Sequence, residues 1–234
     1  MNFGRQIKRL GKIGDVLLTD KNYLVFGSNG SIGSRCVEQL QEIGNVLCGS
    51  RDSSKFDLEL EQVSSISGVV WAQGVNSSDS IEEFNAVDFN KVIDANVVFI
   101  LSITKKLLES KKLTKDAQLV IVSSIWSQLS RPNKLSYSIS KTALLGVIRS
   151  LAIDLGAGGI QVNAVAPGPI DTPMTRGNLS SQELDRLISE TPIKRLVTLD
   201  EVVNTLCAFV TGQMSGVSGQ EIVIDGGWSV SKLV

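Results

Sequence analysis

The chain has 234 residues, of which 42% are hydrophobic and 20% charged, and its formal net charge is -1. This length permits one sizeable core, so we expect a single domain over residues 1–234. Interspersed charges of near-zero sum leave no basic face for nucleic acid, and no apolar run approaches the length of a membrane span. We therefore expect neither a nucleic-acid partner nor a membrane partner.

The first 20 residues carry basic side chains but no apolar stretch and no small-residue cleavage site of the secretory kind. We treat them as an N-terminal leader of unknown role. The three cysteines are widely spaced and form no CxxC, which is typical of free thiols in a reducing compartment. The cytoplasm is therefore the expected location.

The chain contains no histidine, which excludes a Ser-His triad, an imidazole base and the usual His-containing zinc sites. We expect no metal centre. Proton transfer must then use carboxylates, lysine, tyrosine or cysteine, each with its pKa moved by its surroundings.

In chain order, apolar segments alternate between strand-like and helix-like periods. A short β run, YLVF, is followed by apolar residues at helical spacing, which predict a helix that Gly44 can end. Val- and Ile-rich runs then predict four further strands, at residues 45–50, 68–74, 117–124 and 160–167. This alternation favours an α/β fold, a doubly wound parallel sheet of Rossmann type in three layers α/β/α.

Local signals add detail to this fold. Ser80 with Glu83, and Thr198 with Glu201, match the capping box that begins a helix. Between residues 51 and 57 the chain has no room for a full crossover helix, so we expect a thin helical layer there.

The turn GSNGSIG places Gly27, Gly30 and Gly33 between the first strand and its helix. Glycines allow positive φ and close backbone approach, and the helix that follows offers free N–H groups and a positive dipole end. The turn is thus a candidate phosphate cradle.

The stretch YSISK places Tyr137 and Lys141 four residues apart, on one face of a helix predicted over residues 136–155. The pKa of a tyrosine is ordinarily about 10, and a nearby positive charge lowers it. A tyrosine paired with a lysine can therefore act as acid and base in a chain without histidine.

From residue 22 to 228 the chain resembles the short-chain dehydrogenase/reductase family, in particular its single-domain 3-oxoacyl-ACP-reductase-like members. Tyr137 and Lys141 match the family's Y-x-x-x-K motif, Ser124 its catalytic serine, and Asn96 its catalytic asparagine. The segments VNAVAPGPIDTPM, TPIKRLVTLDEVV and SGQEIVIDGG match later parts of the family pattern in order.

The resemblance implies an oxidoreductase that transfers a hydride between NAD(P)(H) and a carbonyl or secondary alcohol. Tyr137 would exchange the proton with the substrate oxygen, and Ser124 would donate a hydrogen bond to it. Lys141 would lower the pKa of Tyr137 and hold the nicotinamide ribose, and Asn96 would position a water.

Two departures leave alternatives open. The glycines are spaced 1-4-7 with Ser31 at the fifth place, a spacing commoner in the nucleotide-sugar branch, and WAQG replaces the family's N-N-A-G. The glycine spacing therefore keeps a nucleotide-sugar epimerase or dehydratase as an alternative function, and a non-catalytic dinucleotide-binding sensor is a second alternative.

The cofactor choice depends on the end of the second strand, where an acidic residue favours NAD and an arginine accommodates the 2′-phosphate of NADP. Ser50 stands at the acidic position and Arg51 follows, which favours NADP(H) and leaves NAD(H) open, because Asp52 could turn inward. The resemblance assigns the cofactor to Gly27, Ser28, Asn29, Ser31, Ile32, Arg51, Asp57, Ala72, Gln73, Gly74, Tyr137, Lys141, Pro167, Gly168, Ile170 and Thr172.

The expected substrate is a small or partly apolar carbonyl compound or alcohol. The family's pocket-lining segments here contain Trp126, Leu129, Met174 and Leu179. A 3-oxoacyl thioester, a sugar-derived ketone and a polycyclic ketone all remain open. The helix after Tyr137 is apolar around much of its circumference, so we expect a homotetramer or homodimer.

Overall fold

Six parallel strands form the centre of the structure. A computed structural model describes residues 20–231, without the side chains of Met174 and Asn178. The sheet has the order β2-β1-β3-β4-β5-β8, and β6 pairs with β7 outside it. The strands are β1 (Asn22–Phe26), β2 (Asn45–Gly49), β3 (Ile66–Trp71), β4 (Leu113–Val122), β5 (Gln161–Pro167), β6 (Ile170–Asp171), β7 (Val197–Thr198) and β8 (Glu221–Ile224).

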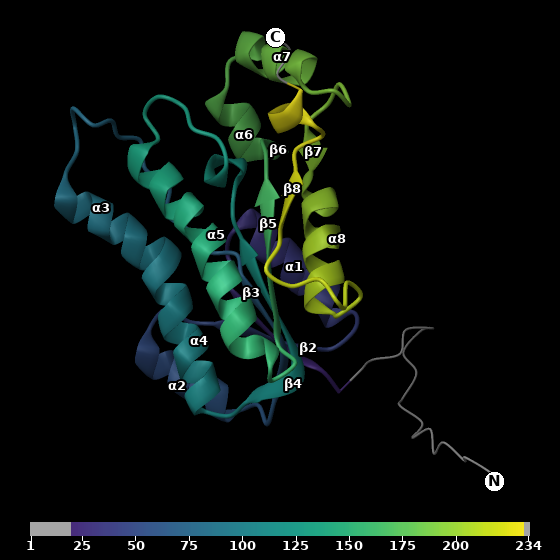
Figure 1. Cartoon of the computed structure of the whole chain (residues 1–234). Coiled ribbons are helices and arrows are strands. Elements are labelled where there is room, and N and C mark those ends of the chain that lie inside the picture. The colour runs from purple at the N-terminus through teal and green to yellow at the C-terminus, as the bar shows by residue number, and fades with distance from the viewer. Residues whose placement is uncertain (1–19, 232–234) are drawn as a thin grey trace.

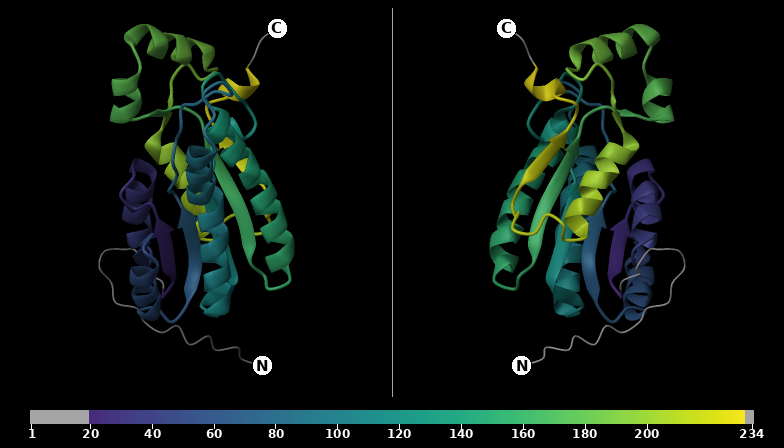
Figure 2. Two further views of the ribbon diagram at one scale, coloured as in Figure 1. Left: turned by 90° about the vertical axis from the view of Figure 1, so that its left-hand side faces the viewer. Right: turned by 90° about the vertical axis from the view of Figure 1, so that its right-hand side faces the viewer.

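Helices cover both faces of this sheet (Figures 1 and 2). α1 and α8 pack on one face, and α2, α4 and α5 on the other. The helices are α1 (Ser31–Gln41), α2 (Ser53–Glu61), α3 (Ala86–Ile93), α4 (Phe99–Glu109), α5 (Leu135–Gly156), α6 (Pro173–Asn178), α7 (Ser181–Glu190) and α8 (Leu199–Val210). A π-helical turn, η1 (Asp94–Val98), joins α3 to α4, and two 3₁₀ turns are η2 (Ile125–Ser127) and η3 (Trp228–Val230).

The strands are apolar on both faces, which explains the three layers. In β1, Leu24 and Phe26 belong to the core under α2, α4 and α5, whereas Tyr23 and Val25 belong to the core under α1 and α8. Successive side chains of a strand point to opposite faces, so a continuous apolar run needs cover on both sides. The predicted doubly wound α/β fold is confirmed.

The helix α2 corrects the expectation that residues 51–57 leave no room for a crossover helix. The side chain of Asp52 accepts a hydrogen bond from the backbone N–H of Lys55 and so caps the helix. Phe56 and Leu60 are buried in the core beneath it. Nine residues are enough because the crossover from β2 to β3 passes over β1 alone.

One of the two predicted capping boxes is correct. Thr198 and Glu201 form the reciprocal bonds at the start of α8. At Ser80 and Glu83 the structure has a turn instead, and the helix begins later, at α3, where the side chain of Asn85 accepts from two backbone N–H groups. Ser80 and Glu83 match the sequence pattern of a capping box, but Asn85 is the residue that caps α3.

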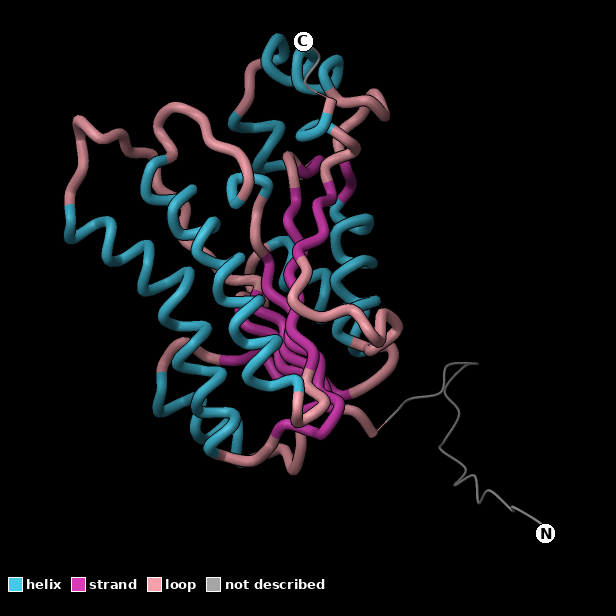
Figure 3. The backbone as a smooth tube through the Cα atoms, in the orientation of Figure 1, coloured by secondary structure: helices cyan, strands magenta, loops and turns pink. Residues whose placement is uncertain are grey.

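The loops after β1, β3, β4 and β5 leave the sheet along its carboxyl edge (Figure 3), and α6 and α7 lie beyond that edge (Figure 1). Ligands of doubly wound sheets bind in the crevice at this edge. The expected leader, residues 1–20, falls almost entirely outside the described residues.

Candidate active site

The glycine turn after β1 is shaped by close backbone contacts. Gly27 has φ +77°, and a Cβ added to it would lie 2.6 Å from the backbone N of Gln73. A Cβ on Gly33 would lie 2.1 Å from the carbonyl oxygen of Gly27. No side chain caps the N-terminus of α1, whose N-cap residue is Gly30. The turn therefore combines an uncapped helix N-terminus with a backbone that only glycine permits, which fits a pyrophosphate.

Three of the predicted catalytic residues line one cavity of about 370 Å³. Ser124 follows β4, while Tyr137 and Lys141 project from the first turns of α5. The cavity also contains Ile32, Ala72, Gln73, Gly74, Asn76, Val122, Ser123, Pro167, Gly168 and Ile170. The structure thus brings together the glycine-turn helix, the WAQG segment, the serine and the Tyr-Lys pair.

The electrostatics of this cavity depend on burial. Burial raises the pKa of Tyr137 above its usual value, and a hydrogen bond with the Ser124 hydroxyl acts in the opposite direction. Burial lowers the pKa of Lys141 to about 8, opposed by the charge of Glu221. The Lys141 ammonium donates to the Val122 carbonyl at 3.0 Å and lies 5.7 Å from the Tyr137 ring centre. The hydrogen bond with Ser124 thus opposes the rise in the tyrosine pKa, and the lowering of this pKa by Lys141 stays a prediction.

Asn96 is buried in the π-helical turn η1 and does not line the cavity directly. Its side-chain oxygen accepts from the backbone N–H of Val75 at 2.7 Å, and its side-chain nitrogen donates to the Val75 carbonyl at 2.9 Å. The same nitrogen donates to the Ser140 hydroxyl at 2.9 Å. Asn96 therefore fixes the segment after β3 against α5.

Lys134 is a residue of the site that the sequence did not single out. It is only 5% exposed, and its ammonium lies 5.6 Å from the centre of the Tyr137 ring. The ammonium donates to the Asn76 side chain at 2.7 Å and to the Ser77 carbonyl at 2.9 Å. The place of Lys134, three residues before the tyrosine of YSISK, does not by itself indicate these contacts. Lys134 ties the segment after β3 to the start of α5.

The end of β2 carries opposing charges. Arg51 is exposed, and Asp52 is turned toward the N-terminus of α2, which it caps. Glu59 reaches back from α2, and its carboxylate accepts from the backbone N–H of Ser50 at 2.8 Å. The sequence had no signal for this contact. Asp57 lies on α2, where it pairs with Lys106.

Several predicted cofactor residues do not line the cavity. Ser28, Asn29 and Ser31 lie in the turn beside it, and Thr172 caps α6. Arg51 lies beyond the end of β2, and Asp57 is not brought to the site. The resemblance assigned Asp57 to the cofactor, and the structure places it within the helix α2.

A second cavity, of about 530 Å³, lies between the loop after Ser124 and the helices α6 and α7. Trp126 and Trp228 meet there edge to face with ring centres 6.3 Å apart, and Leu179 and Leu187 add apolar walls. Two of the four predicted pocket residues, Trp126 and Leu179, line it. Leu129 lines a different cavity, and the side chain of Met174 lies outside the described part of the structure.

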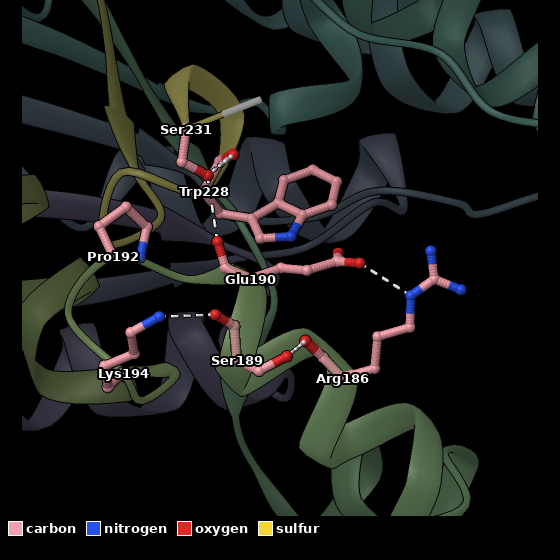
Figure 4. A pocket seen from close by; sticks show the side chains of 7 residues that line it. All are labelled: Arg186, Ser189, Glu190, Pro192, Lys194, Trp228 and Ser231. Atoms are coloured by element: carbon pink, nitrogen blue, oxygen red, sulfur yellow. Dashed lines mark hydrogen bonds and ion pairs between the residues drawn. The ribbon is translucent and has the colours of Figure 1, made fainter. Parts of the chain in front are cut away.

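A neighbouring cavity of about 800 Å³ shares Arg186, Glu190 and Trp228 with the second one (Figure 4). The Arg186 guanidinium donates to the Glu190 carboxylate at 2.8 Å, and the Lys194 ammonium donates to the Ser189 carbonyl at 2.7 Å. These polar contacts lie at the end of α7 and give the outer part of the cleft a mixed charge.

Within residues 20–231, the structure contains no group of three or more His, Cys, Asp or Glu side chains that could hold a metal ion. None of the helices described is long and apolar enough to cross a membrane.

Comparison with known proteins identifies the class to which this fold and cavity belong. A family model described as enoyl-(acyl carrier protein) reductase matches residues 53–229. The chain belongs to the short-chain dehydrogenase/reductase family of oxidoreductases, whose cofactor is a nicotinamide dinucleotide.

Two relatives are 3-oxoacyl-[acyl-carrier-protein] reductases. That of Buchnera aphidicola is 31% identical over 60% of this chain and 57% of its own length. That of Rickettsia felis is 25% identical over 90% of this chain and 97% of its own length. Among solved structures, a short chain dehydrogenase family protein from Francisella tularensis superposes with a TM-score of 0.79 at 24% identity, covering 91% of this chain and 100% of that one. The structural likeness supports the fold.

Proposed function

We propose that this protein is an NADP(H)-dependent carbonyl reductase or alcohol dehydrogenase in which Tyr137 is the general acid and base. The observation that carries the proposal is the single cavity shared by Ser124, Tyr137 and Lys141 with the WAQG segment and the first helix of the glycine turn. A substrate carbonyl in this cavity would meet a phenol, a hydroxyl and a buried ammonium at once.

The roles of these groups follow from where charge develops. When bound, the reduced nicotinamide supplies the hydride that the carbonyl carbon accepts. The carbonyl oxygen then gains negative charge, and the Tyr137 hydroxyl donates its proton to it while the Ser124 hydroxyl donates a hydrogen bond. The Lys141 ammonium favours the resulting phenolate. Asn96 keeps the segment after β3 in place, and the same groups serve the reverse reaction.

The substrate we favour is a 3-oxoacyl thioester or a related partly apolar ketone. The relatives from Buchnera aphidicola and Rickettsia felis are 3-oxoacyl-[acyl-carrier-protein] reductases. The second cavity, with Trp126, Leu179, Leu187 and Trp228, offers apolar walls of a size that suits an acyl chain.

NADP(H) is favoured over NAD(H) by the contacts at the end of β2. Asp52 is held as the cap of α2, so its carboxylate is directed to that helix, and Arg51, just beyond the end of β2, stays exposed. An arginine there supplies positive charge to a 2′-phosphate. The carboxylate of Glu59 lies near the same strand end and would repel a 2′-phosphate. The preference for NADP(H) or NAD(H) therefore depends on the balance between Arg51 and Glu59.

We also propose that the protein acts as a homotetramer or homodimer in the cytoplasm. Ile139 and Ile153 on α5, and Val98 and Leu101 along η1 and α4, are exposed apolar side chains. The cysteines described in the structure are free thiols, which suits a reducing compartment.

The test of the function is a screen of carbonyl substrates with both cofactors, repeated with Tyr137→Phe. This variant keeps the ring and removes the proton. Turnover should fall by roughly 10²- to 10⁴-fold while NADPH affinity changes little. Near-wild-type turnover by Tyr137→Phe would show that another group is the acid, and a wild type that binds neither cofactor would overturn the proposal.

A further inference from the structure

Lys134 is a buried cation at a position where a helix favours the opposite charge. It is the N-cap residue of α5, its side chain makes no capping hydrogen bond, and the residue is only 5% exposed. N-cap positions favour Ser, Thr, Asp or Asn, whose side-chain oxygen accepts from the free N–H groups, and the helix dipole disfavours a positive charge there. Any compensation for this lysine therefore comes from contacts outside the helix backbone.

The hydrogen bonds of the Lys134 ammonium join it to the segment after β3. It donates to the Asn76 side chain at 2.7 Å, to the Ser77 carbonyl at 2.9 Å and to the Ser78 hydroxyl at 3.4 Å. All three acceptors are uncharged, and among the described residues no carboxylate forms an ion pair with the ammonium. These bonds hold a positive charge in place without a negative charge in contact with it.

The other neighbour of this ammonium is the ring of Tyr137. The Lys134 Nζ lies over the ring, 5.6 Å from its centre, and the Lys141 Nζ lies 5.7 Å from the same centre. An ammonium within about 6 Å of an aromatic ring centre is attracted to the ring face. The attraction is stronger when the ring carries a full negative charge, since an opposite charge within about 4–6 Å favours the charged form of an ionisable group.

The other charged groups near Tyr137 are of both signs, but none of them lines its cavity. Those that act on the two lysines are Arg131, Asp79 and Glu221. The Asp79 carboxylate accepts from the backbone N–H and the hydroxyl of Ser136. Apart from Lys141, the described side chains that line the cavity are uncharged. A negative charge on the phenol is therefore closest to ammonium groups.

We propose that Lys134 is a positioning residue for proton transfer, a second ammonium that favours the phenolate form of Tyr137 together with Lys141. The proposal rests on the proposed function, in which Tyr137 gives its proton to the substrate oxygen and keeps the negative charge. The Y-x-x-x-K spacing supplies one lysine four residues after the tyrosine, and Lys134 adds another three residues before it.

The first experiment measures the ionisation of Tyr137 in the cofactor-free protein. The chain has two tyrosines, Tyr23 and Tyr137, so replacing tyrosine with a difluorotyrosine, whose phenol ionises at lower pH, gives two signals in fluorine NMR. Tyr137→Phe assigns them, and the Tyr23 signal is the internal reference, because Tyr23 lies in the core under α1 and α8. Lys134→Met should raise the pKa of Tyr137 by roughly 1–2 units. Lys134→Gln, which keeps a donor for the segment after β3, should give the same shift and replaces the methionine variant if that one does not fold.

A matched control is Ser136→Ala in the first turn of α5. The Ser136 hydroxyl donates to the Asp79 carboxylate and so also ties the segment after β3 to the start of α5, but it carries no charge. This control loses a tether and keeps the Lys134 ammonium, so the pKa of Tyr137 should stay at the wild-type value. An unchanged pKa of Tyr137 in the Lys134 variants, or an equal rise in Ser136→Ala, would overturn the proposal.

The second experiment follows the pH dependence of alcohol oxidation, in which Tyr137 must be ionised to accept the proton. The rise of the rate with pH should move to higher pH by the same roughly 1–2 units in Lys134→Met and should keep its position in Ser136→Ala. A profile that does not move in Lys134→Met would also count against the proposal. A wild type that neither oxidises alcohols nor reduces carbonyl compounds would refute the proposed function, while the NMR titration decides the role of Lys134 independently.

Discussion

Gly33→Ala and Gly30→Ala should affect the glycine turn in different ways. The methyl group that Gly33→Ala adds would lie 2.1 Å from the carbonyl oxygen of Gly27 and 2.7 Å from its carbon, so the backbone must move. Overpacking of this kind costs about 1–3 kcal/mol, whereas the gain in helix propensity from Gly to Ala is at most about 1 kcal/mol. The steric cost prevails.

At Gly30 the balance is different. Its φ of −84° suits alanine, and the added Cβ would meet no atom closer than the Gly27 oxygen at 3.4 Å. The fold should tolerate this change. The methyl would nevertheless stand at the uncapped N-terminus of α1, where a pyrophosphate approaches the backbone.

Thermal unfolding and NADPH titration separate the two effects. For a domain of this size, about 1–2 kcal/mol lowers the midpoint by roughly 2–8 °C, which we expect for Gly33→Ala together with weaker NADPH binding. Gly30→Ala should unfold within about 4 °C of the wild type and bind NADPH at least roughly tenfold more weakly. A Gly30→Ala protein with wild-type affinity would refute the phosphate cradle, and an unchanged Gly33→Ala protein would refute the steric reasoning.

Three further predictions concern charge and assembly. Burial lowers the pKa of Lys141 to about 8 from 10.5, so the unfolded chain binds more protons between these values and stability should rise with pH across that window. Relative to Lys141→Met, the cofactor-free wild type should gain at most about 3 kcal/mol from pH 8 to 10.5 in urea unfolding, and a flat difference would contradict this. Arg51→Ala should weaken NADPH binding roughly ten- to a hundredfold and leave NADH nearly unchanged, and equal losses would refute the NADP(H) preference. Gly146→Arg on α5 should yield a 25.1 kDa monomer by light scattering, whereas the control Gly156→Arg, at the end of the same helix, should keep the oligomer. An oligomer that survives Gly146→Arg would contradict an interface on the face of α5 that carries Gly146.

The sequence predicted the layers of the fold because the spacing of apolar residues and the length of each apolar segment distinguish strands from helices locally. β1, β3, β4 and β5 each contain a short Val-, Ile- or Ala-rich run, such as residues 119–122 of β4, and such runs have few alternatives to a buried parallel sheet. The prediction failed at α2 because an aspartate cap and two buried side chains suffice for a nine-residue helix, and neither is a periodic signal.

The catalytic serine, tyrosine and lysine could be predicted because their spacing within and between elements is part of a pattern. Lys134 and Glu59 could not, since each acts through a contact with a different segment of the chain. Lys134 donates hydrogen bonds to Asn76 and Ser77, which precede it by 58 and 57 positions. Glu59 on α2 accepts a hydrogen bond from the backbone N–H of Ser50, which follows β2. Such contacts depend on the packed structure. Gln73 was predicted at the cofactor as part of WAQG, but only the structure shows that its buried amide has no hydrogen-bond partner among the described residues.

The position of β2 has a consequence for handling the protein. β2 ends the described sheet on one side, and strand edges of this kind can pair with another chain. Cys48 lies in this short strand and is exposed as a free thiol. Two chains that met along β2 would bring these thiols near each other, and air oxidation would then convert a passing encounter into a covalent dimer. Purification under a thiol reductant should therefore yield a more homogeneous sample than purification without one.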